Sequence, residues 1–282
     1  MTLKYYGYST AQWLSTRLPS AAAFRWAQRA ADVQWRRSTR DRAIVQRNLS
    51  ILTGSPMSHE APMIREVFRN FARYLVEFFT IHQVPSPQVD VEGYEHLTEI
   101  QRQRRGAILL TAHLGNWEVA AILLHRLGFP VTAVALPHED VRMNRLFDAQ
   151  RQRCGIQVIP LGHHAAARSL QCLRAGECLG ILGDRAFADN NVTVSWLGRR
   201  ALLPRGPATL SLRSRAPIIP TFLIREGPWK FRLCFEAPID PTSHAEGDQA
   251  IRQLTEAYAV ALERRLRRHP EQWLMFQPLG ER

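Results

Sequence analysis

Two ionisable residues that could act as a general base and its partner stand close together within residues 106–128. His113 follows an apolar run at residues 107–110, and Glu118 comes five positions later. On one continuous helix, side chains five positions apart would point ~140° away from each other and would not meet. A turn between them can instead fold the carboxylate onto the imidazole, where it fixes the tautomer and stabilises the imidazolium formed during proton transfer. The spacing therefore allows a His113–Glu118 dyad, and the alternative is an ordinary turn histidine beside a first-turn glutamate.

The residues around this pair predict a strand, a turn and a helix. The apolar run at 107–110 has strand length, and residues 114–116 read Leu-Gly-Asn, which favours a turn. From Trp117 onward, apolar residues recur at helical spacing. Asn116 is suited to be the N-cap of this helix, and Glu118 then lies in its first turn, where the helix dipole favours a negative charge.

Short apolar strands alternate with helices through the rest of the chain. We expect strands at 89–91, 107–110, 129–136, 156–161, 178–182, 192–197 and 230–235, and helices at 97–105, 140–154, 165–175 and 249–268. This alternation predicts an α/β domain at residues 86–282, with a mixed, centrally parallel sheet flanked by helices. Sites in such sheets lie beyond the carboxyl ends of the strands. His113 follows one such strand end, and Asp184 with Arg185 follows another.

Residues 1–85 predict a helical extension that precedes this domain. The first fifty residues mix aromatic side chains with arginines, a combination that suits the headgroup layer of an anionic bilayer. The alternative is an amphipathic helix whose aromatic residues pack on the domain. A second helical stretch at 60–84 carries Arg69, Arg73 and Glu77 at i, i+4 spacing, so we expect these three side chains to pair on its surface.

The charge of the chain points to a polyanionic partner. Its 282 residues carry a formal net charge of +12. Nearly all of its basic residues are arginines, with lysine only at Lys4 and Lys230. Nucleic acid, an anionic membrane surface, an acidic carrier protein or a coenzyme would fit this charge, although a GC-rich genome also produces an arginine bias. The four cysteines form no C-x-x-C pair, so we expect them to be reduced and no metal to be bound. No run approaches ~20 apolar residues, so any attachment should be to the membrane surface.

The hexamer His-Leu-Gly-Asn-Trp-Glu at residues 113–118 resembles the signature of the lysophospholipid acyltransferase superfamily. The full hexamer is similar to the form of this signature in the branch that contains bacterial lipid A late acyltransferases and phosphatidylinositol mannoside acyltransferases. The resemblance implies a glycerol-3-phosphate acyltransferase-like fold. It also implies transfer of a fatty acyl group from acyl-CoA or acyl carrier protein to a hydroxyl of a lipid or glycolipid acceptor. The His–Glu pair would act as general base, with no covalent acyl-enzyme and no cofactor. The enzyme would be peripheral, at the cytoplasmic face of the bacterial inner membrane.

The resemblance also assigns a role to the second strand end. Asp184 and Arg185 match an acidic residue and its neighbour that the family places across the site from the histidine. The family pattern often has Glu, or Asp-Gln, at these positions. Asp184 could therefore orient the histidine, bind the acceptor or pair structurally with Arg185, and a surface ion pair is the alternative to all three.

Other supporting residues are carried over in the same way. Residues 199–207 resemble a Gly/Pro-rich turn before a helix whose start faces the site, where Arg205 and Gly206 would hold a phosphate or an oxyanion. Asn116 and Arg151 are further candidates for supporting or substrate-binding residues. Residues 270–273, Pro-Glu-Gln-Trp, resemble the C-terminal ending of the family.

Three other functions compete with O-acyl transfer. A thioesterase or lipid hydrolase could use the same dyad to activate water instead of an alcohol. A nucleic-acid-binding protein would fit the charge, but no helix-turn-helix, zinc-finger or RNA-stacking signature accompanies it, so we expect no nucleic-acid partner. A degenerate acyl-lipid-binding protein could have kept the fold, although the intact His113 and Glu118 argue against that.

Overall fold

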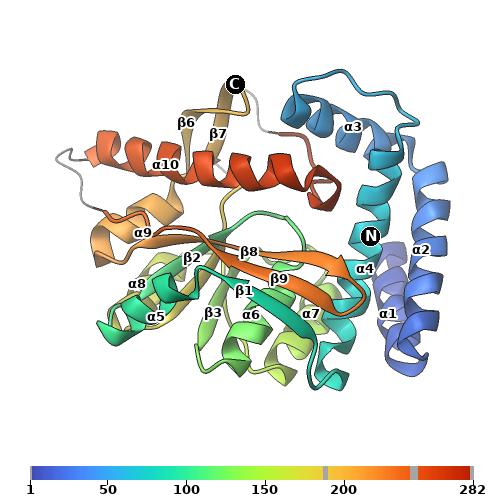
Figure 1. The fold of residues 1–282 in the computed structure, drawn as a ribbon, viewed down its shortest axis with the longest axis horizontal. Coiled ribbons are helices and arrows are strands. Elements are labelled where there is room, and N and C mark those ends of the chain that lie inside the picture. The colour runs from blue at the N-terminus through green and yellow to red at the C-terminus, as the bar shows by residue number, and fades with distance from the viewer. Residues whose placement is uncertain (1, 187–189, 242–246, 280–282) are drawn as a thin grey trace.

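A computed structural model describes residues 2–186, 190–241 and 247–279, and a seven-stranded sheet forms its centre (Figure 1). The strands of this sheet are β1 (Gln88–Glu92), β2 (Ala107–Thr111), β3 (Val131–Ala135), β4 (Gln157–Pro160), β5 (Cys178–Leu182), β8 (Ile218–Gly227) and β9 (Lys230–Phe235). Their order is β1-β9-β8-β2-β5-β3-β4. All neighbours run parallel except β8 and β9, which are antiparallel. The prediction of a mixed, centrally parallel sheet is therefore confirmed.

Ten α-helices accompany the sheet in the described residues. They are α1 (Thr2–Arg17), α2 (Ser20–Arg37), α3 (Thr39–Thr53), α4 (Pro62–Thr80), α5 (Tyr94–Arg102), α6 (Trp117–Arg126), α7 (Val141–Arg153), α8 (Ala165–Arg174), α9 (Gly206–Ser214) and α10 (Gly247–Arg268). Two 3-10 turns, η1 (Ile81–Gln83) and η2 (Pro270–Gln272), follow α4 and α10. Among the described helices, none combines the length and the apolar character needed to cross a membrane.

The sheet is buried on both faces, and β2 shows this most clearly. Ile108 and Leu110 belong to the core cluster shared with α8, α9 and α10, whereas Ala107 and Leu109 belong to the cluster shared with α5, α6 and α7. Successive side chains of a strand point to opposite faces, so a strand between two helical layers must be apolar throughout. Figure 1 shows α10 crossing one side of the sheet and α6 and α7 lying on the other.

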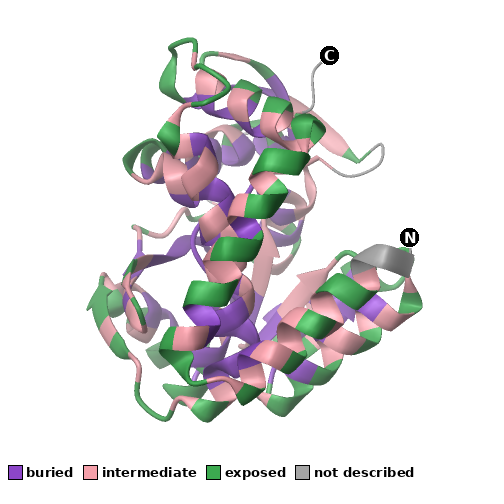
Figure 2. Cartoon of the chain, turned by 90° about the vertical axis from the view of Figure 1, so that its right-hand side faces the viewer, coloured by how far each residue is buried: buried purple, intermediate pink, exposed green. Residues whose placement is uncertain are grey.

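The N-terminal helices α1 to α4 pack together beside the sheet (Figure 1). Figure 2 views the molecule from their side and shows buried strands behind helices whose outer turns are exposed. The expected boundary at residue 85 stays a prediction, and both large core clusters cross it. Leu49 of α3 and Phe68 of α4 share one cluster with β2, and Phe78 of α4 shares the other with α6.

Two local predictions need correction. Residues 199–204, expected as part of a turn, instead form the strand β7 (Arg199–Pro204), which pairs antiparallel with β6 (Asn191–Trp196). The turn is only two residues long, and Leu197 and Gly198 take the left-handed backbone conformation that lets two strands reverse directly. The helix expected at 97–105 begins earlier, at Tyr94, because Gly93 with a φ of 71° provides the entry.

The expected surface pairing of Arg69, Arg73 and Glu77 is also wrong. Arg69 binds Asp32 of α2, and Arg73 binds Glu66. The Glu77 side chain is fully buried and forms a two-pronged ion pair with Arg225 of β8. The helix itself was predicted correctly, but the burial of one of its faces decided which charged side chains could reach each other.

Removal of the arginine from this buried pair should destabilise the fold strongly. Arg225→Met would leave the Glu77 carboxylate buried without its counterion, so we expect a loss of about 3–5 kcal/mol in the free energy of unfolding. The double variant Glu77→Gln/Arg225→Met should lose less, because it buries no uncompensated charge. Urea unfolding at neutral pH measures both.

The matched control is Arg252→Met in the exposed Arg252–Glu256 pair of α10. We expect a change within about 0.5 kcal/mol there, because exposed ion pairs contribute little. An effect of Arg225→Met no larger than that of the control would contradict a structural role for the buried pair.

Candidate active site

His113 lies just beyond the end of β2, at the edge of the sheet where the parallel strands end. Thr111, the last residue of β2, is in register with Leu182, the last residue of β5. Two residues after each of these strand ends come His113 and Asp184, so the parallel pairing places them side by side. This confirms that the two strand ends lie together, as expected for a site beyond the carboxyl edge of such a sheet.

Backbone hydrogen bonds hold the segment from His113 to Asn116 from three sides. The His113 N–H donates to Asp184 Oδ2 at 2.9 Å, and its carbonyl accepts from the Leu274 N–H at 2.7 Å. The Gly115 N–H donates to the Gln272 carbonyl, and the Asn116 N–H donates to the Leu223 carbonyl of β8. The imidazole is therefore carried by a fixed loop.

Gly115 is required by the path of this loop. Its φ is 63°, and a Cβ atom built there would lie 1.9 Å from the Leu223 carbonyl oxygen. A side chain would have to push the loop away from β8, and His113 would move with it.

The imidazole of His113 is bound by the carboxylate of Asp184. His113 Nδ1 lies 2.8 Å from Asp184 Oδ1. The Asp184 side chain is fully buried, and its Oδ2 accepts the His113 backbone N–H and, at 2.9 Å, the indole N–H of Trp273. Each carboxylate oxygen thus has at least one donor.

These partners keep Asp184 ionised. Burial by itself would raise the pKa of Asp184, but the charge of His113 and the hydrogen bonds from His113 and Trp273 outweigh it and leave the pKa below its ordinary value of 3.8. An ionised carboxylate can only accept hydrogen bonds, so His113 Nδ1 carries the hydrogen. When the ring is neutral, Nε2 is left with a lone pair, which is the arrangement of a general base.

Glu118 has a different partner from the one expected. Its carboxylate binds Arg151 of α7, with Arg151 Nη2 at 2.5 Å and Nε at 3.0 Å. The described hydrogen bonds join His113 to Asp184 and not to Glu118. The reason is the direction of α6: Glu118 lies in its first turn and faces α7, while His113 precedes the turn and faces β5.

Arg151 connects α6 and α7 through this contact. It also binds Asp148, and it is largely buried. Burial disfavours its charge, but Glu118 and Asp148 outweigh burial and hold the pKa of Arg151 above its ordinary value. Arg151 therefore supports the start of α6, and among the described contacts it does not touch His113.

Asn116 is the N-cap of α6, as predicted. Its side-chain oxygen accepts the Val119 N–H at 3.1 Å, and its amide donates to Glu77 at 2.8 Å. The buried pair of Glu77 and Arg225 therefore also fixes the end of the His113 loop.

An aromatic ring packs against the imidazole of His113. Trp117 meets His113 edge to face with ring centroids 5.1 Å apart, and Trp117 stacks on Tyr74 at 4.6 Å. Such rings restrict water beside the base and orient its ring.

Arg185, Arg205 and Gly206 lie in two different places. Arg185 lines a small cavity of about 120 Å³ beside Asp184, together with Trp196, Met275 and other residues. Arg205 and Gly206 stand at the start of α9, where Arg205 binds Asp248. Among the described contacts, neither of these two touches His113 or Asp184, so their role as anion ligands stays a prediction.

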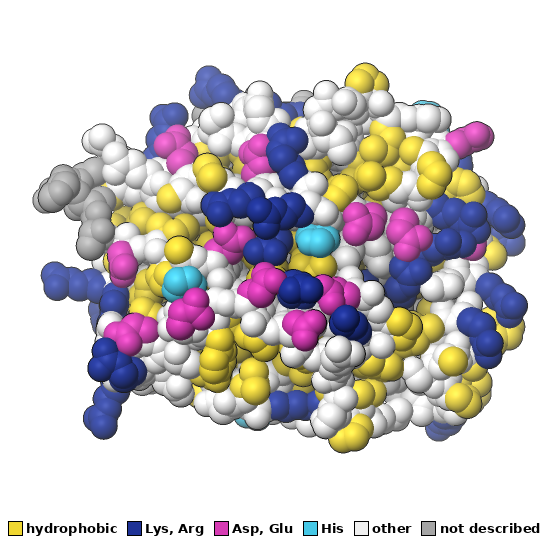
Figure 3. All heavy atoms as spheres, viewed as in Figure 1, with side chains coloured by type: hydrophobic (Ala, Val, Ile, Leu, Met, Phe, Trp, Pro, Cys, Tyr) yellow, Lys and Arg dark blue, Asp and Glu magenta, His cyan; other side chains and the backbone are white. Residues whose placement is uncertain are grey.

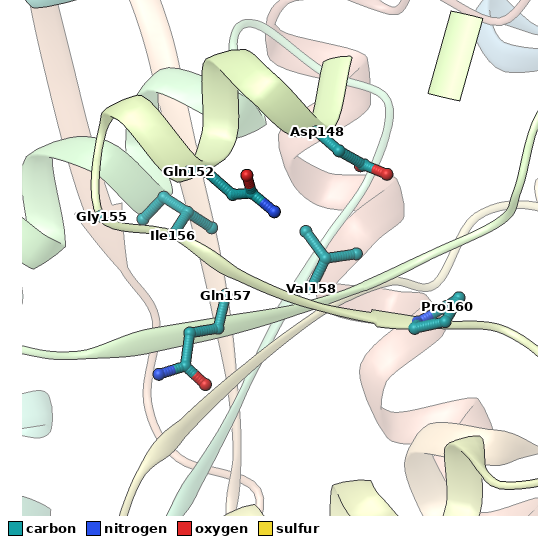
Figure 4. A pocket seen from close by; sticks show the side chains of 7 residues that line it. All are labelled: Asp148, Gln152, Gly155, Ile156, Gln157, Val158 and Pro160. Carbon is teal, nitrogen blue, oxygen red and sulfur yellow. The ribbon is translucent and has the colours of Figure 1, made fainter. Parts of the chain in front are cut away.

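A second cavity, of about 500 Å³, lies at the far edge of the sheet (Figure 4). It opens between α7, which supplies Asp148 and Gln152, and residues 155–160. His113 and Asp184 do not line it, and its carboxylate, Asp148, already binds Arg151. The candidate active site therefore remains the edge near β2 and β5, where His113 and Asp184 meet.

Sequence reasoning missed the contact of Trp273 with Asp184. A signal for it existed, because a buried indole N–H needs an acceptor and Trp273 ends the Pro-Glu-Gln-Trp segment. The acceptor could not be named, since it lies 89 residues away in the chain.

Comparison with known proteins agrees with this site. The family model described as bacterial lipid A biosynthesis acyltransferase matches residues 2–279. The chain belongs to this family. It is therefore an acyltransferase of the lipid A and phosphatidylinositol mannoside type, and the expected branch is confirmed.

Two relatives illustrate the range of the family. The phosphatidylinositol mannoside acyltransferase of Mycolicibacterium smegmatis is 29% identical over 244 residues, covering 83% of this chain and 78% of that protein. The lipid A biosynthesis palmitoleoyltransferase of Escherichia coli is 23% identical over 255 residues, covering 86% of this chain and 81% of that protein.

Stability should depend on pH through Asp184. A carboxyl group whose pKa is lowered by folding stabilises the fold at pH values above its ordinary pKa of 3.8. This contribution is lost as the pH falls through the lowered pKa of the folded state. The difference in unfolding free energy between the wild type and Asp184→Asn should therefore be largest near pH 6 and shrink toward about pH 3. Urea unfolding at several pH values measures it.

The control for this series is Asp90→Asn on the exposed side of β1. Its difference from the wild type should be small and nearly constant over the same range. A constant difference for Asp184→Asn as well would argue against a carboxylate held ionised by its partners.

Proposed function

We propose that this acyltransferase moves a fatty acyl group from a thioester donor to a hydroxyl of a glycolipid, with His113 as general base and Asp184 as its orienting carboxylate. The observation that carries the proposal is the Nδ1–Oδ1 hydrogen bond of 2.8 Å between them, at the carboxyl edge of a parallel sheet. It makes Nε2 the basic atom, as in a catalytic triad that lacks its own nucleophile. The acceptor hydroxyl takes the place of that nucleophile.

The reaction would proceed without a covalent acyl-enzyme. His113 Nε2 takes the proton of the acceptor hydroxyl while the hydroxyl oxygen attacks the thioester carbonyl carbon. The tetrahedral intermediate then collapses: the C–S bond breaks, the thiolate leaves, and His113 returns the proton to the sulfur. An ester and a free thiol are the products, so atoms and charges balance.

The intermediate needs donors for its oxyanion. We propose that backbone N–H groups at the start of α6 contribute, because the helix dipole favours negative charge there. Glu118 and Arg151 then serve to fix the position of α6 and not to move protons.

The donor would be acyl-CoA or acyl carrier protein, and both are anionic. The net charge of +12 suits either. On the face that carries α10, β8, β9 and β1, basic side chains are interspersed with acidic ones (Figure 3). We propose that Arg185, half-buried beside Asp184, meets a phosphate or an oxyanion near the base.

Transfer is favoured over hydrolysis by the surroundings of the base. Trp117, which is backed by Tyr74, packs against His113, and the imidazole side chain is only 17% exposed. A thioesterase needs water at this position, whereas an acyltransferase must exclude it.

Loss of the base or of its carboxylate should abolish most of the activity. We expect His113→Ala and Asp184→Asn each to lower kcat by about 10²–10⁴-fold, because general-base catalysis depends on the ring and on its tautomer. The measurement is transfer of labelled acyl groups from acyl-CoA and, separately, from acyl carrier protein to mycobacterial and Gram-negative glycolipid extracts.

Glu118→Gln is the matched control, since it removes one carboxylate charge from the same edge of the sheet. We expect a loss of kcat below about tenfold, accompanied by lower stability. A loss for Glu118→Gln as large as that for Asp184→Asn would restore the His113–Glu118 dyad. Labelled free fatty acid as the main product with every acceptor would support the hydrolase.

We also propose that the exposed Trp13 of α1 and Trp26 of α2 bind an anionic membrane surface. Trp13 and Trp26 are 53% and 55% exposed, although tryptophan is highly buried on average. Arg17 lies over the ring of Trp13 and Arg29 over that of Trp26, at 4.9 and 5.8 Å from the ring centroids. An aromatic ring beside an arginine suits the boundary between acyl chains and anionic headgroups.

Binding to vesicles tests this surface. The double variant Trp13→Ala/Trp26→Ala should bind vesicles of phosphatidylglycerol and phosphatidylcholine at least about fivefold more weakly than the wild type does. Added salt should weaken vesicle binding by the wild type. Val260→Ala, which removes an exposed apolar side chain from α10, is the control and should bind as the wild type. Equal binding of all three proteins would contradict the proposal.

A further inference from the structure

The chain after α10 crosses the site as an extended segment. Residues 270–277, which we call the C-terminal strap, begin at η2 and lie beside the His113 loop. Trp273 forms an antiparallel bridge with Leu114, and the Leu274 N–H donates to the His113 carbonyl at 2.7 Å. The Gly115 N–H donates to the Gln272 carbonyl at 3.0 Å. The strap therefore acts as an extra short strand against the loop that carries the base.

Trp273 extends from this strap to the buried carboxylate. Its indole Nε1 lies 2.9 Å from Asp184 Oδ2, and its side chain is almost fully buried. The same oxygen accepts the His113 backbone N–H, while the other oxygen binds the imidazole. The carboxylate is thus held at both oxygens, and rotation about its own bond would break the contact with the ring.

We propose that Trp273 is a positioning residue for acyl transfer: its indole N–H fixes Asp184, and through it the tautomer and direction of the His113 ring. This inference rests on the proposed function, because it requires His113 to be the base. Trp273 itself touches neither the acceptor nor the donor in this scheme, and it acts through Asp184 alone.

The N-terminal helices hold the strap in register. Asn48 of α3 donates to the carbonyls of Met275 and Gln277, at 3.0 and 2.8 Å. Asn70 of α4 donates to the carbonyl of Glu271 at 2.7 Å. Both amides are buried, so losing either bond would leave buried polar groups unpaired.

Gln272 fixes the strap to the sheet in the same region. Its side-chain oxygen accepts the Arg225 N–H, and its amide donates to the Arg225 carbonyl, both at 2.9 Å. The strap is therefore bound on the sheet side as well as on the helix side, and the position of the Trp273 ring follows from both.

The hydrogen bond, and not the bulk of the ring, is the distinctive feature of Trp273. Trp196 packs edge to face against it with centroids 6.2 Å apart, and its own buried indole N–H has no partner among the described residues. Trp35, on α2, has a buried indole N–H that likewise lacks a partner in the described part of the chain. The chain thus contains tryptophans that pack without a specific hydrogen bond, which provides a matched comparison.

The test removes the N–H and keeps the shape. Replacing Trp273 with 3-benzothienylalanine, in which sulfur stands for the indole N–H, should lower kcat about tenfold and leave KM within about twofold, because only the alignment of the base is disturbed. Trp273→Phe should have the same effect or a larger one. Trp35→Phe is the control and should keep both constants, because the Trp35 N–H has no partner among the described residues.

The pH profile supplies a readout that packing alone would not move. Besides His113, the titratable groups that interact electrostatically with Asp184 in the described part of the chain are the Arg185 guanidinium and the Tyr258 hydroxyl of α10, which donates to the Pro204 carbonyl. None of these is altered by the isostere. Without the indole N–H, the Asp184 carboxylate loses one of its donors and acts more strongly on the His113 ring that it binds, so the acid limb of kcat should move to higher pH in the isostere and stay in place in Trp35→Phe.

The outcomes separate this inference from the proposed function. If the isostere has the kcat and pH profile of the wild type while His113→Ala is inactive, Trp273 is a packing residue and the inference is wrong. If His113→Ala keeps full activity, the proposed function itself is wrong. A matching fall in kcat for Trp35→Phe would show that any indole substitution disturbs the enzyme, and would equally overturn a specific role for Trp273.

Discussion

The buried, ionised carboxylate of Asp184 is the constraint on which the site depends. Removing a carboxylate from water costs several kcal/mol unless donors replace the lost hydration. Here the donors are the ring and backbone of His113 and the indole of Trp273. They come from segments far apart in the chain, so the charge is tolerated only when the sheet, the His113 loop and the C-terminal strap are all in place. Formation of the site and completion of the fold are therefore coupled.

The parallel sheet accounts for part of this arrangement. Adjacent parallel strands end at the same edge, and the register of β2 with β5 places the residues that follow them side by side. Register alone does not set the direction of a ring. That direction comes from the tight approach of Gly115 to β8 and from the strap, which together leave the His113 backbone almost no freedom. The rigid elements bring the groups near each other, and the irregular segments align them.

Sequence patterns predicted what depends on local chemistry. The strand before His113, the cap at Asn116 and the alternation of strands and helices are local, and the structure confirms them. The partners of charged residues are not local. Glu118 and Glu77 could each have bound several nearby cations, and burial selected Arg151 and Arg225, which lie 33 and 148 residues away. The resemblance to a family implied both Glu118 and Asp184, and of these two carboxylates the structure places that of Asp184 within hydrogen-bonding distance of the His113 ring.

The hexamer at 113–118 can now be understood as a junction at which adjacent residues serve different parts of the molecule. His113 faces Asp184, Gly115 permits contact with β8, and Asn116 caps α6 while binding Glu77. Glu118 then joins α6 to α7 through Arg151. Five positions separate the histidine from the glutamate because a turn must fit between the end of a strand and the first turn of a helix. The spacing thus reflects two separate contacts on the two sides of that turn: Glu118 binds Arg151, and His113 binds Asp184, which follows a strand distant in sequence.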